Sequence, residues 1–200
     1  MAISLKRTSS PSSYPVTLAR VKEHLRVTWS SEDDLITAYL AAAVNQAQAE
    51  SNLQFIDATY KLYLDNFPVN LLSEIPAEDR FAIRIPVGPV TAITSVEYID
   101  ANGDTQTVNA SNYYVGLNTG RIVPAVAWPI VYIPRPESVI VTLQAGWANA
   151  AAVPSEIVSA ILIMVADKYA NRGDGQSQAR GLPPAALALL RNVRDNWMFD

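Results

Sequence analysis

The most informative absence in this 200-residue chain is cysteine, of which it has none. Without cysteine the chain cannot form disulfides, use a thiolate nucleophile, or ligate zinc or iron through sulfur. Histidine is nearly absent as well, since His24 is the only one. A histidine that serves as general base or metal ligand needs a second group within hydrogen-bond reach, and the residues near His24 supply none at local spacing. The sequence therefore offers no support for most metal and acid–base chemistries.

Charged residues are also scarce, at 17% of the chain against about 25% in a typical soluble domain. Half of the residues are hydrophobic, which indicates either apolar surface covered by partners or a high alanine content that exposes little. The net charge is −4, and no run of Lys or Arg occurs. A tight grip on nucleic-acid phosphates through released counterions is therefore not indicated.

Long hydrophobic runs are missing too. The most apolar run, residues 160–166, is far shorter than the roughly 20 residues needed to span a bilayer. Near the N-terminus, Lys6 and Arg7 are followed by the Ser/Pro-rich stretch Thr8–Ser13, where a signal peptide would have its apolar core. We therefore predict no membrane contact, and we expect residues 1–14 to form a flexible arm.

The first part of the chain has helical periodicity. A helix is predicted from Thr17, its N-cap, to Arg26. A second, amphipathic helix is predicted over Ser31–Asn52. Ser30 or Ser31 would open this helix with a capping box, because an acid follows either serine three residues later.

Helical periodicity returns near the end of the chain. A third helix is predicted over Pro154–Arg172, and its apolar residues lie on nearly every side. Such a helix must be surrounded, either within its own core or by neighbouring subunits. A glycine-containing loop over 173–182 leads to a fourth helix, Pro183–Trp197, whose apolar stripe either docks on this chain or on another.

The region between these helices alternates between polar and apolar residues, as β-strands do. An Asn102-Gly103 pair predicts a type I′ hairpin turn. Six or seven short strands are expected, over Tyr60–Leu64, Phe81–Ile85, Ile93–Ile99, Thr105–Asn109, Tyr113–Gly116, Arg121–Val123 and Val139–Ala145.

No catalytic motif accompanies these elements. A Gly-x-Ser-x-Gly nucleophile elbow is absent, and Glu32, Asp33 and Asp34 are acids of the kind favoured at a helix start by the helix dipole. We therefore predict no catalytic residue, no metal site, no cofactor and no enzymatic activity. One alternative is an enzyme whose acids converge in a pocket, the candidates being Asp65, Glu97 and Asp100.

A second alternative is a carbohydrate- or surface-binding module. Aromatic side chains exposed on one face of a sheet would form a stacking platform for sugars or bases, whereas the same residues buried would be ordinary strand packing. The candidates are Tyr60, Tyr63, Tyr98, Tyr113, Tyr114, Trp128 and Tyr132.

The order of several short motifs along the chain resembles the head-tail connector (adaptor) proteins of long-tailed bacteriophages and of gene transfer agents. The resemblance covers about residues 15–195. The motifs are Pro15–Leu18, Val21–Val27, Glu32–Ile36, Pro86–Val90, Ile93–Asp100, Gly120–Pro124, Val153–Pro154 and Lys168–Arg172.

This resemblance implies a ring, expected to be a dodecamer, between the capsid portal and the stopper or tail, with DNA passing through without sequence recognition. The expected location is the virion, after synthesis in the cytoplasm of the bacterial host. It also implies a portal-docking C-terminal helix, with docking residues Leu187, Leu189, Leu190, Val193, Arg194 and Trp197. Contacts between subunits are expected at Ile157, Ile161, Met164 and Tyr169.

The predicted fold is α+β, a helical bundle formed by the N- and C-terminal helices with an inserted β-rich domain. The bundle is expected over 15–52 and 153–172, and the β domain over 53–152. Residues 183–200 are expected to form the docking helix.

Overall fold

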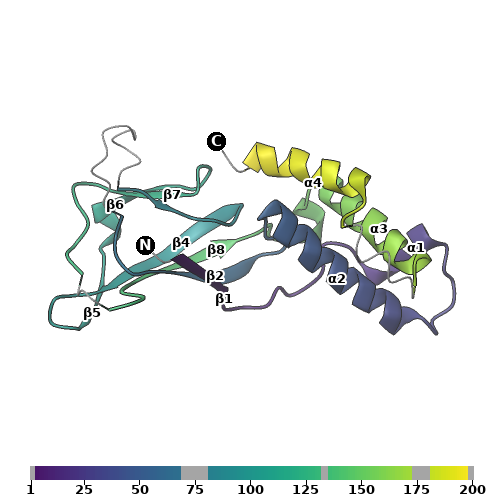
Figure 1. Ribbon diagram of the computed structural model, residues 1–200, viewed down its shortest axis with the longest axis horizontal. Helices are drawn as coiled ribbons and strands as arrows, with labels where there is room; N and C mark the ends of the chain where they lie inside the picture. The colour runs from purple at the N-terminus through teal and green to yellow at the C-terminus, as the bar shows by residue number, and fades with distance from the viewer. Residues whose placement is uncertain (1–2, 69–80, 132–134, 173–180, 198–200) are drawn as a thin grey trace. The chain divides into compact units, whose positions relative to one another are not determined.

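The computed structural model describes residues 3–68, 81–131, 135–172 and 181–197, without the side chains of 195–197. The chain divides into two compact units. The first, residues 1–10 and 57–146, is called the sheet domain here, and the second, residues 11–56 and 147–200, the helical domain. Helices and antiparallel strands are both present (Figure 1), which confirms the α+β class.

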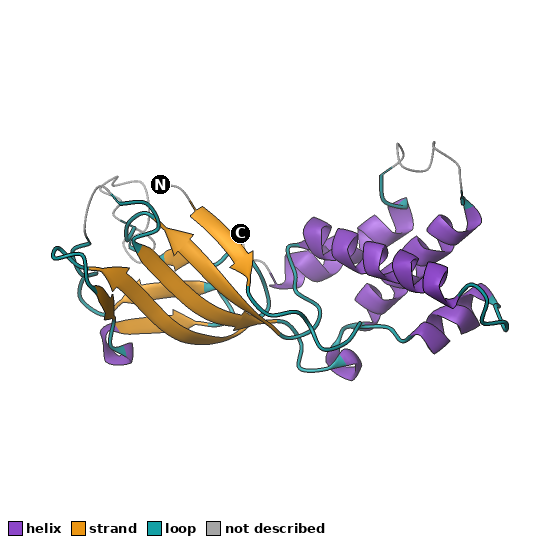
Figure 2. Cartoon of the chain, turned by 90° about the horizontal axis from the view of Figure 1, so that it is seen from below, coloured by secondary structure: helices purple, strands orange, loops and turns teal. Residues whose placement is uncertain are grey.

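The sheet domain contains two antiparallel sheets. The larger has the order β1-β2-β8-β4-β5 and the smaller the order β3-β7-β6. Figure 2 shows the strands of this domain, in orange, twisting as they run side by side. The strands of the described residues are β1 (Ile3–Arg7), β2 (Ala58–Leu64), β3 (Ile83–Arg84), β4 (Val90–Ile99), β5 (Thr105–Thr107), β6 (Tyr113–Gly116), β7 (Arg121–Pro124) and β8 (Val139–Ala145).

In the central strands β2 and β8, every second side chain is buried, and these side chains form the core of the larger sheet. Leu62 in β2 faces Val141 in β8 across the ladder, and both are fully buried. Lys61 between the buried positions of β2 stays partly exposed. Because side chains alternate between the two faces of a strand, one face of each strand packs on the apolar core while the other carries the polar residues.

Strand β1 corrects the expectation of a flexible arm over residues 1–14. Ile3–Arg7 pairs antiparallel with β2 (Figure 1). The register places Ile3 opposite Leu64 and Arg7 opposite Tyr60. Leu5 packs against the core of the sheet domain. The strand was not predicted because its four other side chains are exposed, so it has little hydrophobic pattern and depends on an edge supplied by β2.

The turn between β4 and β5 also differs from the type I′ prediction. A type I′ turn needs positive φ at both central residues, but Asn102 is not among the residues with positive φ, whereas Gly103 has φ 88°. Ile99 pairs with Thr105, and the Asp100 amide donates to the Asp104 carbonyl. These contacts make a three-residue loop with a left-handed glycine at its end, which is the next most common hairpin connection.

The helical domain contains α1 (Leu18–Leu25), α2 (Asp33–Ser51), α3 (Ser155–Ala170) and α4 (Pro184–Trp197). All four contribute to one apolar core. Its fully buried side chains include Val21, Leu40, Ile161 and Leu190, one from each helix. Helices from the two ends of the sequence therefore share this core.

The helix starts agree only in part with the predicted caps. The Thr17 side chain accepts a hydrogen bond from the Arg20 amide at 3.2 Å, as expected of an N-cap. No capping box opens α2, because its N-cap is Glu32, whose side chain makes no capping bond. The Glu32 carboxylate binds side chains of other segments instead.

The domain boundaries lie a few residues inside the predicted limits of 53 and 152. Leu53, Phe55 and Ile56 are buried in the helical core, so the chain leaves the helical domain after Ile56. On the return, Trp147 packs against the same core. Most of the predicted loop over 173–182 lies outside the described residues.

Candidate functional site

The α3 residues predicted as subunit contacts lie in the core of the chain's own helical domain. Ile157 and Ile161 are fully buried and Met164 is 1% exposed. Contacts with α1, α2 and α4 account for this burial. These three side chains are thus covered within the chain, so they leave no apolar area for a neighbouring subunit. Tyr169 is only partly buried and takes part in a polar network.

The α4 residues predicted to dock on a portal fall into two groups. Leu190 and Val193 are buried in the helical core at 0% and 4% exposure. In this conformation they stabilise the chain's own bundle and are not free for a partner. Leu187, Leu189 and Arg194 keep part of their surface accessible. The Trp197 side chain lies outside the described residues.

Leu187 faces an open groove between α2 and α4. Its volume is about 440 Å³. The groove contains one acid and one base, Glu50 and Arg191, on walls that are otherwise neutral. The lining residues are Gln46, Ala49, Glu50, Gly181, Leu182, Leu187 and Arg191.

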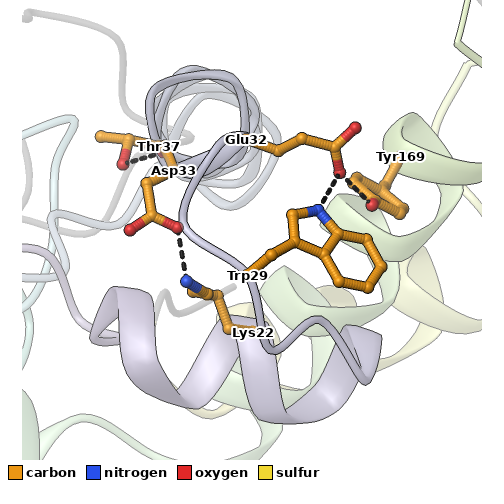
Figure 3. A network of polar contacts seen from close by, with 6 residues as sticks. All are labelled: Lys22, Trp29, Glu32, Asp33, Thr37 and Tyr169. Carbon is orange, nitrogen blue, oxygen red and sulfur yellow. Dashed lines mark hydrogen bonds and ion pairs between the residues drawn. The ribbon is translucent and has the colours of Figure 1, made fainter.

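A polar network connects the start of α2 with the end of α3 (Figure 3). Glu32 accepts hydrogen bonds from the Tyr169 hydroxyl and, at 3.3 Å, from the indole nitrogen of Trp29. Arg172 Nη1 lies 2.6 Å from Glu32 Oε1, and its guanidinium lies 4.3 Å from the centroid of the Tyr169 ring. We call Trp29, Glu32, Tyr169 and Arg172 the Glu32 clasp.

An ion pair next to the Glu32 clasp connects the first two helices. Lys22 Nζ in α1 lies 2.5 Å from Asp33 Oδ1 at the start of α2 (Figure 3). The Thr37 hydroxyl donates to the backbone carbonyl of Asp33 at 2.7 Å. Together with the clasp, this pair joins α1, α2 and α3 at one end of the helical domain.

The clasp changes the protonation equilibria of its members. The Tyr169 hydroxyl, followed by Arg172, lowers the pKa of Glu32 because both stabilise the ionised carboxylate. The hydrogen bond to Glu32 raises the pKa of Tyr169, since ionised tyrosine could not donate it. Glu32 is therefore held ionised, which suits a structural ion pair.

The aromatic residues of the sheet domain pack mainly on one another. Phe67 stacks on Trp128 with ring centroids 4.7 Å apart and contacts Tyr98 at 5.9 Å. Tyr113 contacts Trp128 from the other side at 6.4 Å. Tyr60 is 9% exposed and Tyr63 partly buried. Of the candidates for a stacking platform that the structure describes, only Tyr114 is strongly exposed, at 70%, and Tyr132 lies outside the described residues.

The three acids considered for an enzyme serve local structure. Asp100 accepts from the amides of Asn102 and Asp104 within its own turn. Asp65 accepts from the Glu137 amide, and Glu97 accepts from the Ser95 hydroxyl. Across the described residues, no three His, Asp or Glu side chains are grouped so that they could hold a metal ion. Nor does any helix in this part of the chain have the length and apolar character to cross a membrane.

Comparison with known proteins identifies the family. A sequence profile of phage gp6-like head-tail connector proteins matches residues 15–116, slightly more than half of the chain. The chain belongs to this family. The match includes α1 and α2 of the helical domain and strands β2 to β6 of the sheet domain. The connector has no match among curated proteins.

Solved structures extend the likeness of the connector over almost the whole chain. A chain from the neck of an empty gene transfer agent particle, computed with C6 symmetry, has 22% sequence identity and a TM-score of 0.71, with 98% of this chain and 96% of that one covered. A chain from the native virion of a gene transfer agent has 21% identity and a TM-score of 0.70, covering 98% and 95%. A chain from the native neck with C12 symmetry has 20% identity, a TM-score of 0.69 and coverage of 98% and 96%. At these identities the similarity establishes the fold.

The Glu32 clasp was not found from the sequence. Glu32 belongs to an acid run that a helix start favours in any case, and 137 positions separate it from Tyr169. The motifs Glu32–Ile36 and Lys168–Arg172 both contributed to the family resemblance, but a single sequence cannot show that they meet.

Proposed function

We propose that the connector is a structural component of the virion neck and has no enzymatic activity. Copies of the chain form a closed ring, a dodecamer, between the capsid portal and the stopper or tail, and DNA passes through the ring. The protein is made in the bacterial host cytoplasm and incorporated into the virion. The profile match to head-tail connectors over residues 15–116 carries this proposal.

Two further observations support it. The chain shares its fold over 98% of its length with neck chains from particles computed with C6 and C12 symmetry, and closed cyclic symmetry requires identical copies in a ring. The three acids considered for an enzyme make local hydrogen bonds, which is consistent with an assembly role.

We propose that α4 contacts the portal with the surface that remains accessible in the folded chain. Leu187 and the groove beside α2 supply an apolar surface, with Glu50 and Arg191 as charged groups at the same place. Arg194, two turns after Leu187, extends this surface along the helix. Leu189 adds a partly accessible side chain on another side of α4. Leu190 and Val193 support the contact indirectly, because they hold α4 against α3.

DNA passes through the ring without sequence recognition. The acidic net charge of −4 suits this role, because a channel that bound phosphates tightly would slow DNA transit. The alternative of a carbohydrate-binding module is not favoured, because Phe67, Tyr98, Tyr113 and Trp128 contact one another.

Particles assembled without the connector test the proposal directly. We expect capsids that contain DNA but carry no attached tail in electron micrographs, and normal particles when the chain is restored. Cryo-electron microscopy of the restored particles should show density for the chain in a ring next to the portal. Tailed, infectious particles assembled in the absence of the chain would contradict a neck function.

A further inference from the structure

The segment that follows β7 is held in place by buried residues. The Trp128 ring stacks on Phe67 with 6° between the ring planes, and its indole nitrogen donates to the Phe81 carbonyl at 2.6 Å. Val131 is 4% exposed. At the other end of the segment, the Ala125 amide donates to the Asn112 carbonyl at 2.9 Å. The segment is therefore a fixed part of the sheet domain.

Between these anchors, two aliphatic side chains are almost fully exposed. Val126 is 97% exposed and Ile130 is 84% exposed. Of the ten large hydrophobic residues exposed in the described part of the chain, six belong to the three-stranded sheet or its flanking loops: Phe81, Tyr114, Val115, Leu117, Val126 and Ile130. Single exposed apolar residues are ordinary, but two aliphatic side chains exposed to this degree on one short, fixed segment are typical of an interaction surface. We call the surface formed by Val126 and Ile130 the β7 surface.

The exposed segment carries no charge. Residues 122–134 contain no Asp, Glu, Lys or Arg, and the charged residues of the three-stranded sheet are Arg84 and Arg121, which lie opposite each other in β3 and β7. DNA phosphates and anionic lipid headgroups are bound through clusters of Lys and Arg, so neither fits this surface. A neutral, apolar protein surface does.

We propose that the β7 surface packs against a second copy of this chain and forms the contact between neighbouring subunits. This inference rests on the ring proposed above. Identical chains with a net charge of −4 repel each other, and a neutral apolar surface is where they can approach with the least repulsion. Ile157, Ile161 and Met164 of α3 cannot supply this contact, because they are buried within the chain.

A subunit contact in a closed ring is heterologous, so the β7 surface of one copy meets a different surface of the next. Val126 and Ile130 are held in place before assembly by Trp128 and Val131. Preorganisation of this kind reduces the entropy lost on binding.

The absence of cysteine makes a direct test possible, because one introduced thiol is the only one in the chain. The Val126→Cys variant should react with a maleimide at least tenfold more slowly in the assembled neck than as the free full-length chain. The Ala101→Cys variant, exposed in the β4–β5 turn, is the matched control and should react equally in both states. Equal reactivity of the Val126→Cys variant in both states would overturn the inference.

Photochemical crosslinking identifies what covers the surface. The Ile130→Cys variant is labelled with benzophenone maleimide, assembled and irradiated. We expect a product of two copies of the 21.8 kDa chain. A product that contains a different neck protein would overturn the assignment to a second copy.

A charge variant separates this inference from the proposed ring. Val126→Asp with Ile130→Asp should abolish ring formation while leaving thermal unfolding unchanged, because both side chains are exposed. Ala101→Asp adds the same kind of charge elsewhere and should assemble normally. If the double variant forms rings like the wild type, the inference fails and the ring remains. If the wild-type chain forms no ring in the neck, the proposed function fails and this inference with it.

Discussion

At the scale of single residues, Glu32 shows how one side chain can join helices that are far apart in the sequence. Its carboxylate accepts from Trp29 and Tyr169 and pairs with Arg172. The capping box predicted at Ser30 or Ser31 does not form, because α2 begins at Asp33 and neither serine occupies the N-cap position. The acid of the box that Ser30 would have formed, Asp33, pairs instead with Lys22 of α1.

The Glu32 clasp predicts a specific dependence of stability on pH. The pKa of Glu32 is lowered from 4.5, so its contribution to folding is present above that value and is lost as the pH falls through the lower folded-state pKa. The Glu32→Gln variant should be less stable than wild type at pH 7, and the difference should shrink toward pH 3. Urea unfolding at both pH values measures it.

The Glu23→Gln variant provides the control. Glu23 forms a long, exposed contact with Arg20 at 3.8 Å, and such pairs contribute little. Its unfolding midpoint should follow wild type at both pH values. A Glu32→Gln variant as stable as wild type at pH 7 would show that the clasp does not stabilise the fold.

Substitution of two leucines on α4, one buried and one at the groove, should distinguish a packing role from a docking role. Leu190→Ala should lower the free energy of unfolding by about 2–5 kcal/mol, as for other buried leucines, because Leu190 is fully buried. Leu187→Ala should change stability by only about 0.5 kcal/mol yet weaken binding to the purified portal protein. Thermal unfolding and a pull-down on the portal measure the two effects. Unchanged portal binding by Leu187→Ala would exclude the groove as part of the docking surface.

At the scale of elements, β1 is tied to the sheet through one inward side chain. Leu5→Asp should lower the free energy of unfolding of the sheet domain by about 1–2 kcal/mol, because it removes part of the burial of a leucine. Ser4→Asp, on an exposed neighbour in the same strand, should leave it within about 0.5 kcal/mol. Chemical denaturation distinguishes them. Equal effects of both variants would mean that β1 is not packed through Leu5.

The elements that the sequence predicted best have the strongest periodicity. The alternation in β2 and β8 and the helical stripes in α2 and α4 led to the right structure within a few residues, since each pattern reflects burial in a local core. Strand β1 was missed because its pairing depends on β2, more than 50 positions away. The β4–β5 turn was predicted as a hairpin, but the left-handed conformation falls on Gly103 alone, which a two-residue pattern cannot show.

The candidate site could be predicted from the sequence less completely than the fold could. An apolar stripe indicates that a helix face is covered, but not whether its own chain or a partner covers it. Ile161 in α3 and Leu190 in α4 were both open to either interpretation, and the chain's own core covers them. Val126 and Ile130 were not predicted as surface contacts, because they belong to no helical or strand periodicity in the sequence.

At the scale of the whole molecule, the two domains have separate cores. Domains with their own cores tend to unfold as separate units. Calorimetry should therefore resolve two transitions. Leu62→Ala in the sheet domain and Leu40→Ala in the helical domain, both at buried positions, should each lower one transition and leave the other in place. A single transition lowered by both substitutions would show that the domains unfold together.

The discontinuous helical domain has a consequence for synthesis on the ribosome. α1 and α2 emerge first, but α3 begins only at Ser155 and α4 at Pro184, after β8 has ended at Ala145. The sheet domain can therefore complete its core while α2 still lacks the helices that cover Leu40. Nascent chains stalled with Gly146 outside the ribosome should already resist protease in the sheet domain and remain cleavable in α2. During this interval the unfinished protein carries an unprotected apolar helix that a chaperone can bind, although the finished protein keeps that face buried.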